Sequence, residues 1–327
     1  MGEQTVLLTG GAGYIGSHVA LDLVREGYGV VILDDLSRGF AQAVGNCELV
    51  QGDAGDKGLV SALLNKHRIG SVLHFAGSTI VPESVAEPLR YYENNTVKSR
   101  NLMEACADSG IRHFVFSSTA AVYGTPDSGR VTLETPTEPV NPYGMSKLMT
   151  EIMLRDLSEV APLSYAALRY FNVAGADPDG RVGQSTPGCT LLIKVACEVA
   201  LEKRSHLNIY GTDYPTPDGT GVRDYIHVSD LAAAHVLTLK YLEAGGASIT
   251  LNCGYGHGYS VREVVQAVER VHGGPIPVTA TGRRPGDPPQ LVADGSSARE
   301  TLGWQPRYDD LEFIVRTSYN WEKKRRY

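Results

Sequence analysis

The sequence contains few cysteines, and none of them stand at a metal-binding spacing. Only five of its 327 residues are cysteines, at positions 47, 106, 189, 197 and 253, and no two form a CxxC pair. An odd number of scattered cysteines argues against a disulfide framework and against a zinc site. We therefore expect reduced thiols, a cytoplasmic location and no metal ion.

Long hydrophobic runs and an excess of positive charge are also absent. No apolar stretch approaches the roughly 20 residues that a helix needs to cross a bilayer. The chain enters its first apolar run within a few residues, so we expect no signal peptide. Acidic residues number 37 against 30 basic ones, a formal net charge of −7. We therefore expect neither nucleic acid nor a membrane among the partners.

A glycine cluster follows the first apolar run of the chain. Residues 5–8 favour a strand, Gly10, Gly13 and Gly16 come next, and a helical pattern begins at once. Strand, tight turn and helix in this order open a dinucleotide-binding βαβ unit. Gly10 permits the turn, Gly13 lets backbone N–H groups approach a pyrophosphate, and Gly16 lets the helix pack closely. The positive end of the helix dipole would then face the phosphates.

An acidic residue ends the second predicted strand. Residues 30–33 are apolar, and Asp34 follows, 18 positions after Gly16. An acid at this position binds the adenosine ribose hydroxyls in such folds. Asp34 favours NAD, because a ribose phosphate would meet a like charge there, while Arg38 nearby keeps NADP as an alternative. A glycine turn in an unrelated α/β protein is the other interpretation.

Further apolar runs predict an α/β protein, a Rossmann-type doubly wound parallel sheet with a smaller C-terminal substrate-binding α/β lobe. Loop residues at 175–180 place the boundary between a dinucleotide-binding domain (1–174) and a C-terminal substrate-binding domain (175–327), with segments near 222–253 returning to the first. We expect further strands at 48–53, 71–77, 113–119, 166–172, 207–210 and 249–252, and helices at 59–67, 88–109, 143–157, 190–204, 230–242, 260–272 and 311–324.

Polar or small residues close several of these strands, where open α/β sheets carry their ligands. Asp53 either accepts from an adenine amino group or caps a helix. Asn94 either reaches a cofactor ribose or anchors a loop. His74 is expected to be a hydrogen-bonded core residue, and the hydroxyls of residues 117–119 are candidates for the chemistry.

Tyr143 and Lys147 lie one helical turn apart on the same face of a predicted helix. A free tyrosine has a pKa near 10 and is a poor base at neutral pH. An adjacent ammonium stabilises the phenolate, and lowering the pKa by three units corresponds to roughly 4 kcal/mol. Alone, such a pair usually lies on a surface. Beside nucleotide-binding strands and a strand that ends in hydroxyls, it becomes a specific constellation.

The chain resembles the extended short-chain dehydrogenase/reductase family nearly end to end, and within it the UDP-glucose 4-epimerases. The matching runs are residues 9–18 (TGGAGYIGSH), 74–77 (HFAG), 117–124 (SSTAAVYG), 143–147 (YGMSK), 168–172 (LRYFN) and 219–228 (GTGVRDYIHV). The run at 219–228 is particular to sugar-nucleotide epimerases.

The resemblance implies an NAD-dependent isomerase that interconverts UDP-galactose and UDP-glucose through a transient 4-keto sugar. Tyr143 would take the proton of the sugar 4-hydroxyl while hydride passes to the nicotinamide. Lys147 would lower the tyrosine pKa, and Thr119 would hydrogen-bond the sugar oxygen. The keto sugar would then turn over and take the hydride back on its other face. The resemblance also implies a homodimer through paired helices near 90–109 and 146–157.

The same resemblance implies two sets of binding residues. Those for the cofactor are Gly10, Gly13, Tyr14, Ile15, Gly16, Asp34, Asp53, Ala54, Phe75, Ala76, Gly77, Asn94, Ser117, Tyr143, Lys147 and Tyr170. Those for the substrate are Thr119, Tyr143, Phe171, Asn172, Asn208, Tyr210, Arg223, Arg284, Asp287 and Leu291. Surface ion pairing or packing is the alternative for each substrate residue.

The sequence departs from the family pattern at three places. Thr79 stands where many of these epimerases have a lysine, and residues 186–191 (TPGCTL) lack the usual pattern. Leu291 is intermediate in size at the position that gates the sugar pocket, so UDP-N-acetylhexosamines stay open as substrates. UDP-glucuronate and UDP-pentoses also remain alternatives.

Two other functions are less consistent with the sequence. Sugar dehydratases and decarboxylases on this fold carry acids just after the strand-end hydroxyl, where this chain has Ala120 and Ala121. A non-enzymatic NAD-sensing regulator would commonly lose the Tyr/Lys pair, and this chain keeps it.

Overall fold

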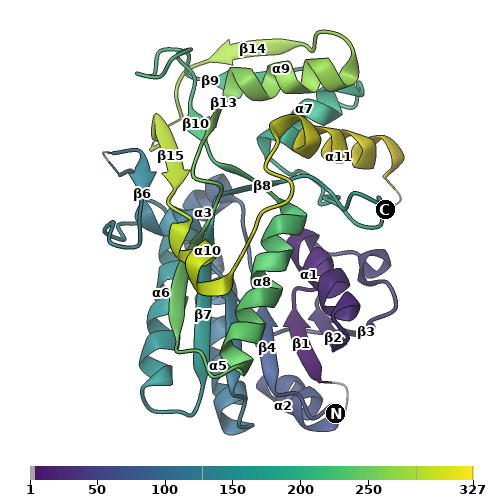
Figure 1. Cartoon of the computed structure of the whole chain (residues 1–327), viewed down its shortest axis with the longest axis vertical. Coiled ribbons are helices and arrows are strands. Elements are labelled where there is room, and N and C mark those ends of the chain that lie inside the picture. The colour runs from purple at the N-terminus through teal and green to yellow at the C-terminus, as the bar shows by residue number, and fades with distance from the viewer. Residues whose placement is uncertain (1–3, 127, 285, 326) are drawn as a thin grey trace.

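A seven-stranded sheet forms the larger part of the molecule, in the order β12-β7-β5-β4-β1-β2-β3. The computed structural model describes residues 4–126, 128–284, 286–325 and 327 (Figure 1). All neighbouring strands of this sheet are parallel. Its strands are β1 (Thr5–Thr9), β2 (Gly29–Asp34), β3 (Glu48–Gln51), β4 (Ser71–His74), β5 (His113–Ser117), β7 (Ser164–Tyr170) and β12 (Ile249–Cys253). The predicted Rossmann-type doubly wound sheet is therefore confirmed.

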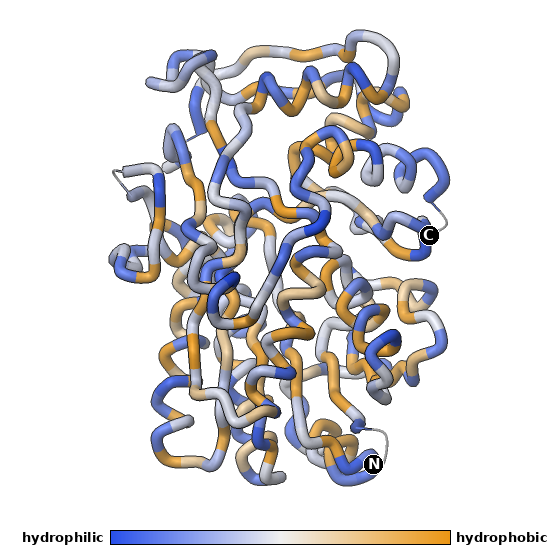
Figure 2. Tube along the Cα trace, viewed as in Figure 1, coloured by the Kyte–Doolittle hydropathy of each residue, from blue (hydrophilic) through white to orange (hydrophobic). Residues whose placement is uncertain are grey.

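Helices cover both faces of the sheet, so the central strands are apolar on both sides. Leu8 of β1 belongs to the buried cluster formed with α1 (Tyr14–Arg25) and α8 (Val228–Glu243). Its neighbour Leu7 belongs to the opposite cluster, formed with α2 (Lys57–Lys66), α5 (Lys98–Asp108) and α6 (Pro142–Ser158). Figure 2 shows hydrophobic residues concentrated along the central strands. Full burial of each Leu or Val contributes about 1.5–3 kcal/mol.

The order of the strands reverses between β1 and β4, because the chain first builds β2 and β3 on one side and then β4 and β5 on the other. Ligands of doubly wound folds bind in the crevice outside the carboxyl ends of the strands at such a switch point. The topology therefore places the glycine turn after β1 and the end of β4 at this crevice.

Helix α6 starts where two local signals coincide. The Asn141 side chain accepts a hydrogen bond from the Gly144 N–H at 2.9 Å, and Pro142 occupies the first turn. Both features are typical of helix N-termini. They place Tyr143 in the first turn of the helix and Lys147 in the second. Helix α9 (Val261–His272) begins with a capping box made by Ser260 and Glu263.

The segment predicted as one helix over 88–109 is less regular than expected. It consists of α4 (Pro88–Tyr91), the π-helical η2 (Tyr92–Val97) and α5. A π-helical turn inserts an extra residue and often marks a functional site. Here it holds Asn95, whose side chain accepts from the Ser78 N–H at 2.7 Å and donates to the Ser78 carbonyl at 3.0 Å. The short helix α3 (Val81–Ala86) was not predicted.

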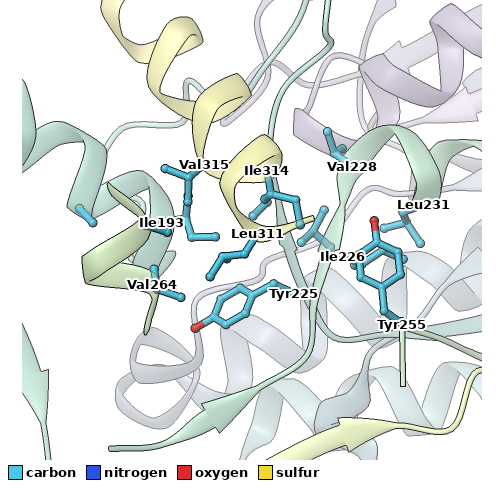
Figure 3. Close-up of a cluster of buried hydrophobic side chains, with 14 of the residues drawn as sticks. Ile193, Tyr225, Ile226, Val228, Leu231, Tyr255, Val264, Leu311, Ile314 and Val315 are labelled. Carbon is cyan, nitrogen blue, oxygen red and sulfur yellow. The ribbon is translucent and has the colours of Figure 1, made fainter. Parts of the chain in front are cut away.

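The smaller lobe is built from a two-stranded parallel sheet and three helices. Its strands are β9 (Leu207–Tyr210) and β14 (Val278–Thr281), and its helices are α7 (Leu192–Ala200), α9 and α11 (Leu311–Lys324). The helix predicted over 190–204 ends early, because Glu202 adopts a left-handed conformation with φ 59°. Figure 3 shows Ile193 of α7, Val264 of α9 and Ile314 of α11 in one buried cluster with Tyr225 and Ile226.

Short strands connect the lobe with the large sheet. The strand predicted over 166–172 contains only the first residue of β8, and the sequence did not predict β6, β10, β11, β13 or β15. These strands form a β8–β11 pair and a four-stranded sheet ordered β13-β10-β15-β6. Their bounds, with those of the remaining short helices, are β6 (Arg130–Val131), β8 (Asn172–Ala174), β10 (Val222–Arg223), β11 (Tyr225–His227), β13 (Tyr259–Ser260), β15 (Gln290–Ala293), η1 (Ala41–Val44), η3 (Ala120–Tyr123) and α10 (Ser296–Leu302).

The segment after β11 runs back to the large sheet. Helix α8 packs against α1, and β12 pairs with β7 as the last strand of the sheet. Residues 228–253 therefore contribute to the same sheet as the N-terminal strands. Among the residues that the structure describes, no helix is both long and apolar enough to span a membrane.

Candidate active site

A cavity of about 1280 Å³ lies at the carboxyl ends of the sheet strands and extends toward the smaller lobe. Typical ligand pockets measure about 300–1,000 Å³, so this cavity has room for more than one small ligand. All the residues predicted for the cofactor line it. So do eight of those predicted for the substrate: Thr119, Tyr143, Phe171, Asn172, Arg223, Arg284, Asp287 and Leu291.

The two remaining residues, Asn208 and Tyr210, do not line the cavity. Both lie on β9, behind the rim. The guanidinium of Arg284 stacks over the Tyr210 ring at 3.7 Å, so Tyr210 is connected to the cavity through a residue that lines it. The structure therefore brings together all the predicted residues except this pair.

The glycine turn between β1 and α1 lines the cavity and has no room for a side chain at Gly10 or Gly16. Gly10 has φ +71°, and a Cβ added there would lie 2.4 Å from the Ala76 nitrogen. A Cβ on Gly16 would lie 2.4 Å from the Gly10 carbonyl oxygen. Helix α1 begins without a side-chain cap or an acidic residue in its first turn. Its first N–H groups are therefore available to an anion, and the residues fit a pyrophosphate.

Asp34 ends β2 and is held by two backbone groups. Its carboxylate oxygens accept hydrogen bonds from the Ala12 and Leu36 N–H groups, each at 2.9 Å. Each oxygen keeps a second lone pair for a ribose hydroxyl. Burial raises the pKa of Asp34, and the two N–H groups oppose that shift. Arg38, the reason for considering NADP, forms an ion pair with Glu83 at 3.2 Å.

Asp53 does not cap a helix, because Asp56 caps α2 instead. Asp53 forms an ion pair with Lys98 at 2.6 Å and accepts from the Gly55 N–H at 2.8 Å. Although burial alone would raise the pKa of Asp53, these contacts lower it. Asn94 donates to the Ser78 hydroxyl at 3.0 Å, so it anchors a loop while also lining the cavity.

His74 is a hydrogen-bonded core residue, as predicted. Its ring nitrogens lie 2.6 Å from the Thr9 hydroxyl and 2.8 Å from the Ser99 hydroxyl. Burial lowers the pKa of His74 to about 3, and the nearby Lys147 adds to this effect. The imidazole is therefore neutral at physiological pH. Across the described residues, no cluster of three or more His, Cys, Asp or Glu is arranged to hold a metal ion.

Tyr143, Lys147 and Thr119 form a buried cluster at the bottom of the cavity. The Lys147 ammonium donates to the Ser117 carbonyl at 3.0 Å and lies 4.8 Å from the centre of the Phe116 ring. Burial lowers the pKa of Lys147 to about 8, and the carboxylate of Glu151 opposes this shift.

The pKa of Tyr143 differs from the sequence-based expectation. Burial raises it above the usual 10.0, and the hydrogen bond with Thr119 only partly opposes this shift. The Lys147 ammonium is directed at the Ser117 carbonyl, and the tyrosine pKa is set by burial and by Thr119. The direction of the shift is therefore opposite to the predicted lowering.

Charged side chains from separate segments meet at the substrate end of the cavity. The Arg223 guanidinium forms an ion pair with Asp287. Arg223 on β10 also pairs in register with Leu291 on β15, which fixes both beside the cavity. Two arginines on one rim can bind a doubly charged pyrophosphate.

The cavity is also lined by parts of the two segments in which the sequence departs from the family pattern, near Thr79 and within 186–191. Residues 79–83 lie on one side, and Gln184 and residues 189–191 lie on another. The Thr186 hydroxyl donates to the Arg38 carbonyl at 3.5 Å, so two of the loops meet near the cavity. Pro82 in the first turn of α3 is a helix-start signal that was present in the sequence. The remaining residues carry no local signal.

Comparison with known proteins identifies a common family. Residues 6–254 match the model of the NAD dependent epimerase/dehydratase family. A UDP-glucose 4-epimerase of Azospirillum brasilense is 57% identical over 97% of this chain and 92% of its own length. The crystal structure of UDP-glucose 4-epimerase from Brucella ovis in complex with NAD has a TM-score of 0.95 at 43% identity, covering 97% of this chain and 98% of that one. The UDP-Glc/GlcNAc 4-epimerase of Campylobacter jejuni has a TM-score of 0.87 at 45% identity, covering 98% and 99%.

Proposed function

The chain belongs to the NAD dependent epimerase/dehydratase family, and from this premise we propose that it is an isomerase that interconverts UDP-galactose and UDP-glucose. The observation that carries the proposal is the buried cluster of Tyr143, Lys147 and Thr119, which lies in one cavity with a glycine cradle and two arginines. The 57% identity to a UDP-glucose 4-epimerase supports it.

NAD is the cofactor, and the N-terminal βαβ unit fits it. The uncapped N–H groups at the start of α1 bind its pyrophosphate, and Asp34 binds the adenosine ribose. Asp34 carries a negative charge that disfavours a ribose phosphate, which argues for NAD over NADP. When bound there, NAD would supply a reversible hydride acceptor for C4 of the sugar, so that no cofactor would be consumed.

Tyr143 removes the proton of the sugar 4-hydroxyl and later returns it. Thr119 holds the same oxygen, so the proton and the hydride leave from a fixed geometry. Lys147, with a pKa of about 8, is charged at neutral pH and stabilises the phenolate when its ammonium reaches Tyr143. Ala120 and Ala121 offer no carboxylate for an elimination, which favours epimerisation over dehydration.

The substrate end binds the UDP moiety through charge and hydrogen bonds. Arg223 and Arg284, with Asn172, bind the pyrophosphate, and Asp287 binds the uridine ribose. Because Arg223 and Asp287 are paired with each other in the chain alone, substrate binding exchanges this ion pair for contacts with the ligand. Asn208 and Tyr210 support Arg284 and lie on the uracil side.

A second candidate substrate class is UDP-N-acetylhexosamines. The Campylobacter jejuni relative is named a UDP-Glc/GlcNAc 4-epimerase. Leu291 lines the cavity and is intermediate in size, which is compatible with both classes. UDP-glucuronate and UDP-pentoses are further alternatives, and a structural relative 41% identical to this chain is named with formylated UDP-arabinopyranose bound.

Proton NMR of the purified protein with UDP-galactose, without added cofactor, tests the function. We expect UDP-glucose to appear, which would show both 4-epimerisation and NAD that co-purifies with the protein. A parallel sample with UDP-N-acetylgalactosamine tests the second class. If neither substrate is converted even after NAD is supplied, the proposed function is wrong.

The assembly we propose is a homodimer. Helices α3, α4 and α6 pack against one another and expose apolar side chains, with Val85 63% and Leu89 80% exposed and Ile152 also exposed. Sedimentation of the wild type and of Leu89→Asp distinguishes a dimer from a monomer. A monomeric wild type would contradict the assignment.

The organisation we propose is an NAD-binding domain over 1–174, completed by segments near 222–253, and a UDP-sugar-binding domain over the rest of 175–327. The pairing of β12 with β7 supports the return of the later segment. A cytoplasmic location is supported by the five cysteines, all of which are free thiols.

A further inference from the structure

A buried ion pair lies directly behind the Tyr143–Lys147 cluster. Glu151 is on α6, one helical turn after Lys147, and only 5% of it is exposed. Arg169 on β7 is 8% exposed, and its Nε donates to Glu151 Oε1 at 3.0 Å and to Oε2 at 3.2 Å. The Arg169 Nη2 also donates to Oε2, so the guanidinium binds both carboxylate oxygens.

Glu151 also binds the end of the strand that carries the reacting hydroxyl. The Ser118 hydroxyl donates to Glu151 Oε1. Ser118 lies between Ser117, whose carbonyl accepts from Lys147 at 3.0 Å, and Thr119. Ser117, the last residue of β5, and Ser118, which follows it, are therefore hydrogen-bonded to Lys147 and Glu151. These two residues of α6 lie one helical turn apart.

The guanidinium group of Arg169 also contacts the segment that follows Thr119. Its Nη1 donates to the Tyr123 hydroxyl at 3.0 Å, and that hydroxyl donates to Asn252 Oδ1 at 2.8 Å. Thr119 is thus flanked by Ser118, held by Glu151, and by Tyr123, held by Arg169. The ion pair joins β5, β7, α6 and η3 at one point.

Stability alone does not account for a buried charge pair at this place. Removing two charges from water costs about as much as their attraction returns, and apolar replacements of such pairs are often neutral or stabilising. The pair does fix geometry, because the carboxylate accepts from Ser118 at the end of β5 through Oε1 and from Arg169 on β7 through both oxygens. Fixed geometry matters most where a base, a hydroxyl and an ammonium act together.

We propose that Glu151 is a positioning residue that holds Thr119 and the Ser117 carbonyl in register with Tyr143 and Lys147, with its carboxylate one helical turn from Lys147. The role rests on the proposed epimerase function. Glu151 itself touches neither the cavity nor the reacting atoms, so it acts through Ser118 and Lys147.

The electrostatic part of the role has a defined sign. Burial disfavours the Lys147 ammonium, and Glu151 is the only anion among the described groups that face it. Loss of that carboxylate lowers the pKa of Lys147 further, so the ammonium is lost at a lower pH and the alkaline limit of activity moves down. The titratable groups around Lys147 are Tyr143 and Glu151 on α6, His74 on β4, Tyr170 on β7 and, behind Glu151, Arg169.

Three variants with one control separate placement from charge. Ser118→Ala removes only the tie to the strand end, Glu151→Gln removes the charge, and Glu151→Asp keeps the charge but shortens the reach. Glu159→Gln makes the same charge change at an exposed position just past the end of α6. For each we would measure kcat and KM for UDP-galactose, the pH profile of kcat, the NAD retained per chain, and the thermal unfolding midpoint.

We expect Glu151→Gln to lower kcat by roughly ten- to a hundredfold, since a misplacement of about 1 Å can cost a hundredfold. Its KM should change little, and its alkaline limit should move to lower pH. Glu151→Asp should lower kcat without moving that limit. Ser118→Ala should lower kcat severalfold at an unchanged unfolding midpoint. Glu159→Gln should match the wild type in every readout.

Wild-type kcat per NAD-loaded chain and an unmoved alkaline limit in Glu151→Gln would overturn the positioning role, even if the variant is less stable. If Glu151→Gln does not fold, Ser118→Ala decides, and a wild-type kcat there would overturn the role. A wild type that converts UDP-galactose while the variants match it refutes only this inference. A wild type that converts nothing refutes the proposed function as well.

Discussion

The two ends of the cavity are built in different ways. At the cofactor end, the expected pyrophosphate and adenosine-ribose sites come from residues 10–36 and depend on backbone groups: the uncapped start of α1 and the N–H groups of Ala12 and Leu36 on Asp34. The substrate end is assembled from distant segments, and its side chains contact one another, as Arg223 does with Asp287 and Arg284 with Tyr210.

This difference indicates different tasks. A backbone cradle has no rotamers to lose and can hold one ligand for many turnovers. Paired side chains can exchange partners, as a site must do if it binds substrate and releases product in each cycle. We therefore expect mutations of backbone geometry to act on NAD and mutations of charge to act on the UDP-sugar.

The largest effect is expected from Gly10→Ala. The new Cβ would lie 2.4 Å from the Ala76 nitrogen at a residue with φ +71°, so either β4 or the turn must move. We expect loss of bound NAD and a lower unfolding midpoint. Gly27→Ala is the matched control, because it has φ +85° but nothing within 4 Å of the added Cβ. The Gly27→Ala variant should lower the free energy of unfolding by about 1–2 kcal/mol and should retain NAD.

Acid should destabilise both ends together. Burial lowers the pKa of His74, at the cofactor end, and that of His227, beside the lobe, each to about 3. Below a pH of about 6.5 the unfolded chain binds protons that the folded chain does not, so stability present above that pH is lost as the pH falls toward 3. Each histidine should lower the free energy of unfolding by about 1–2 kcal/mol between pH 7 and pH 5.

Two probes check whether the ends respond as one unit. Tryptophan fluorescence reports on Trp304 and Trp321, which belong to α10 and α11 and their surroundings, while NAD release reports on the cofactor end. We expect the two thermal transitions to coincide and to shift down together between pH 7 and pH 5. Transitions that separate, or a midpoint that does not change, would contradict this expectation.

Arg223→Gln should affect the substrate end alone. A hydrogen bond to a charged group contributes about 1.5–3 kcal/mol, which corresponds to roughly a 10- to 150-fold increase in KM for UDP-galactose. Retained NAD should not change. Arg283→Gln is the control, since Arg283 pairs with Asp213 and is exposed. Loss of NAD in Arg223→Gln would show that the two ends are coupled.

The smallest effect is expected from Lys98→Met. The ion pair of Lys98 with Asp53 is partly exposed and should contribute about 0–1 kcal/mol. NAD affinity, measured by titration of the apoprotein, should change by less than about threefold. A tenfold loss would show that the cofactor end depends on side-chain charge as well as on the backbone.

The contrast between the ends also explains what the sequence could predict. The glycine turn, Asp34 and the Tyr143–Lys147 pair are local patterns, and the structure places all of them around one cavity. The Arg223–Asp287 pair joins residues 64 positions apart, and no local spacing encodes it. Resemblance to a family suggested both residues but not their pairing.

Other differences between the sequence-based predictions and the structure also have physical causes. Strands β6 and β13 are two residues long and carry no detectable period. The π-helical turn at η2, with the sequence YENNTV, contains no glycine or proline that would mark it off from a plain helix. The direction of the Tyr143 pKa depends on burial, which the one-turn spacing from Lys147 does not report.

The most direct test of the central claim compares the wild type with Tyr143→Phe by proton NMR of UDP-galactose and by the NAD retained per chain. We predict that both proteins retain NAD and that only the wild type forms UDP-glucose. Tyr165→Phe, at the opposite end of β7 from the cavity, should behave as the wild type. Formation of UDP-glucose by Tyr143→Phe at the wild-type rate would contradict the assignment of Tyr143 as the base.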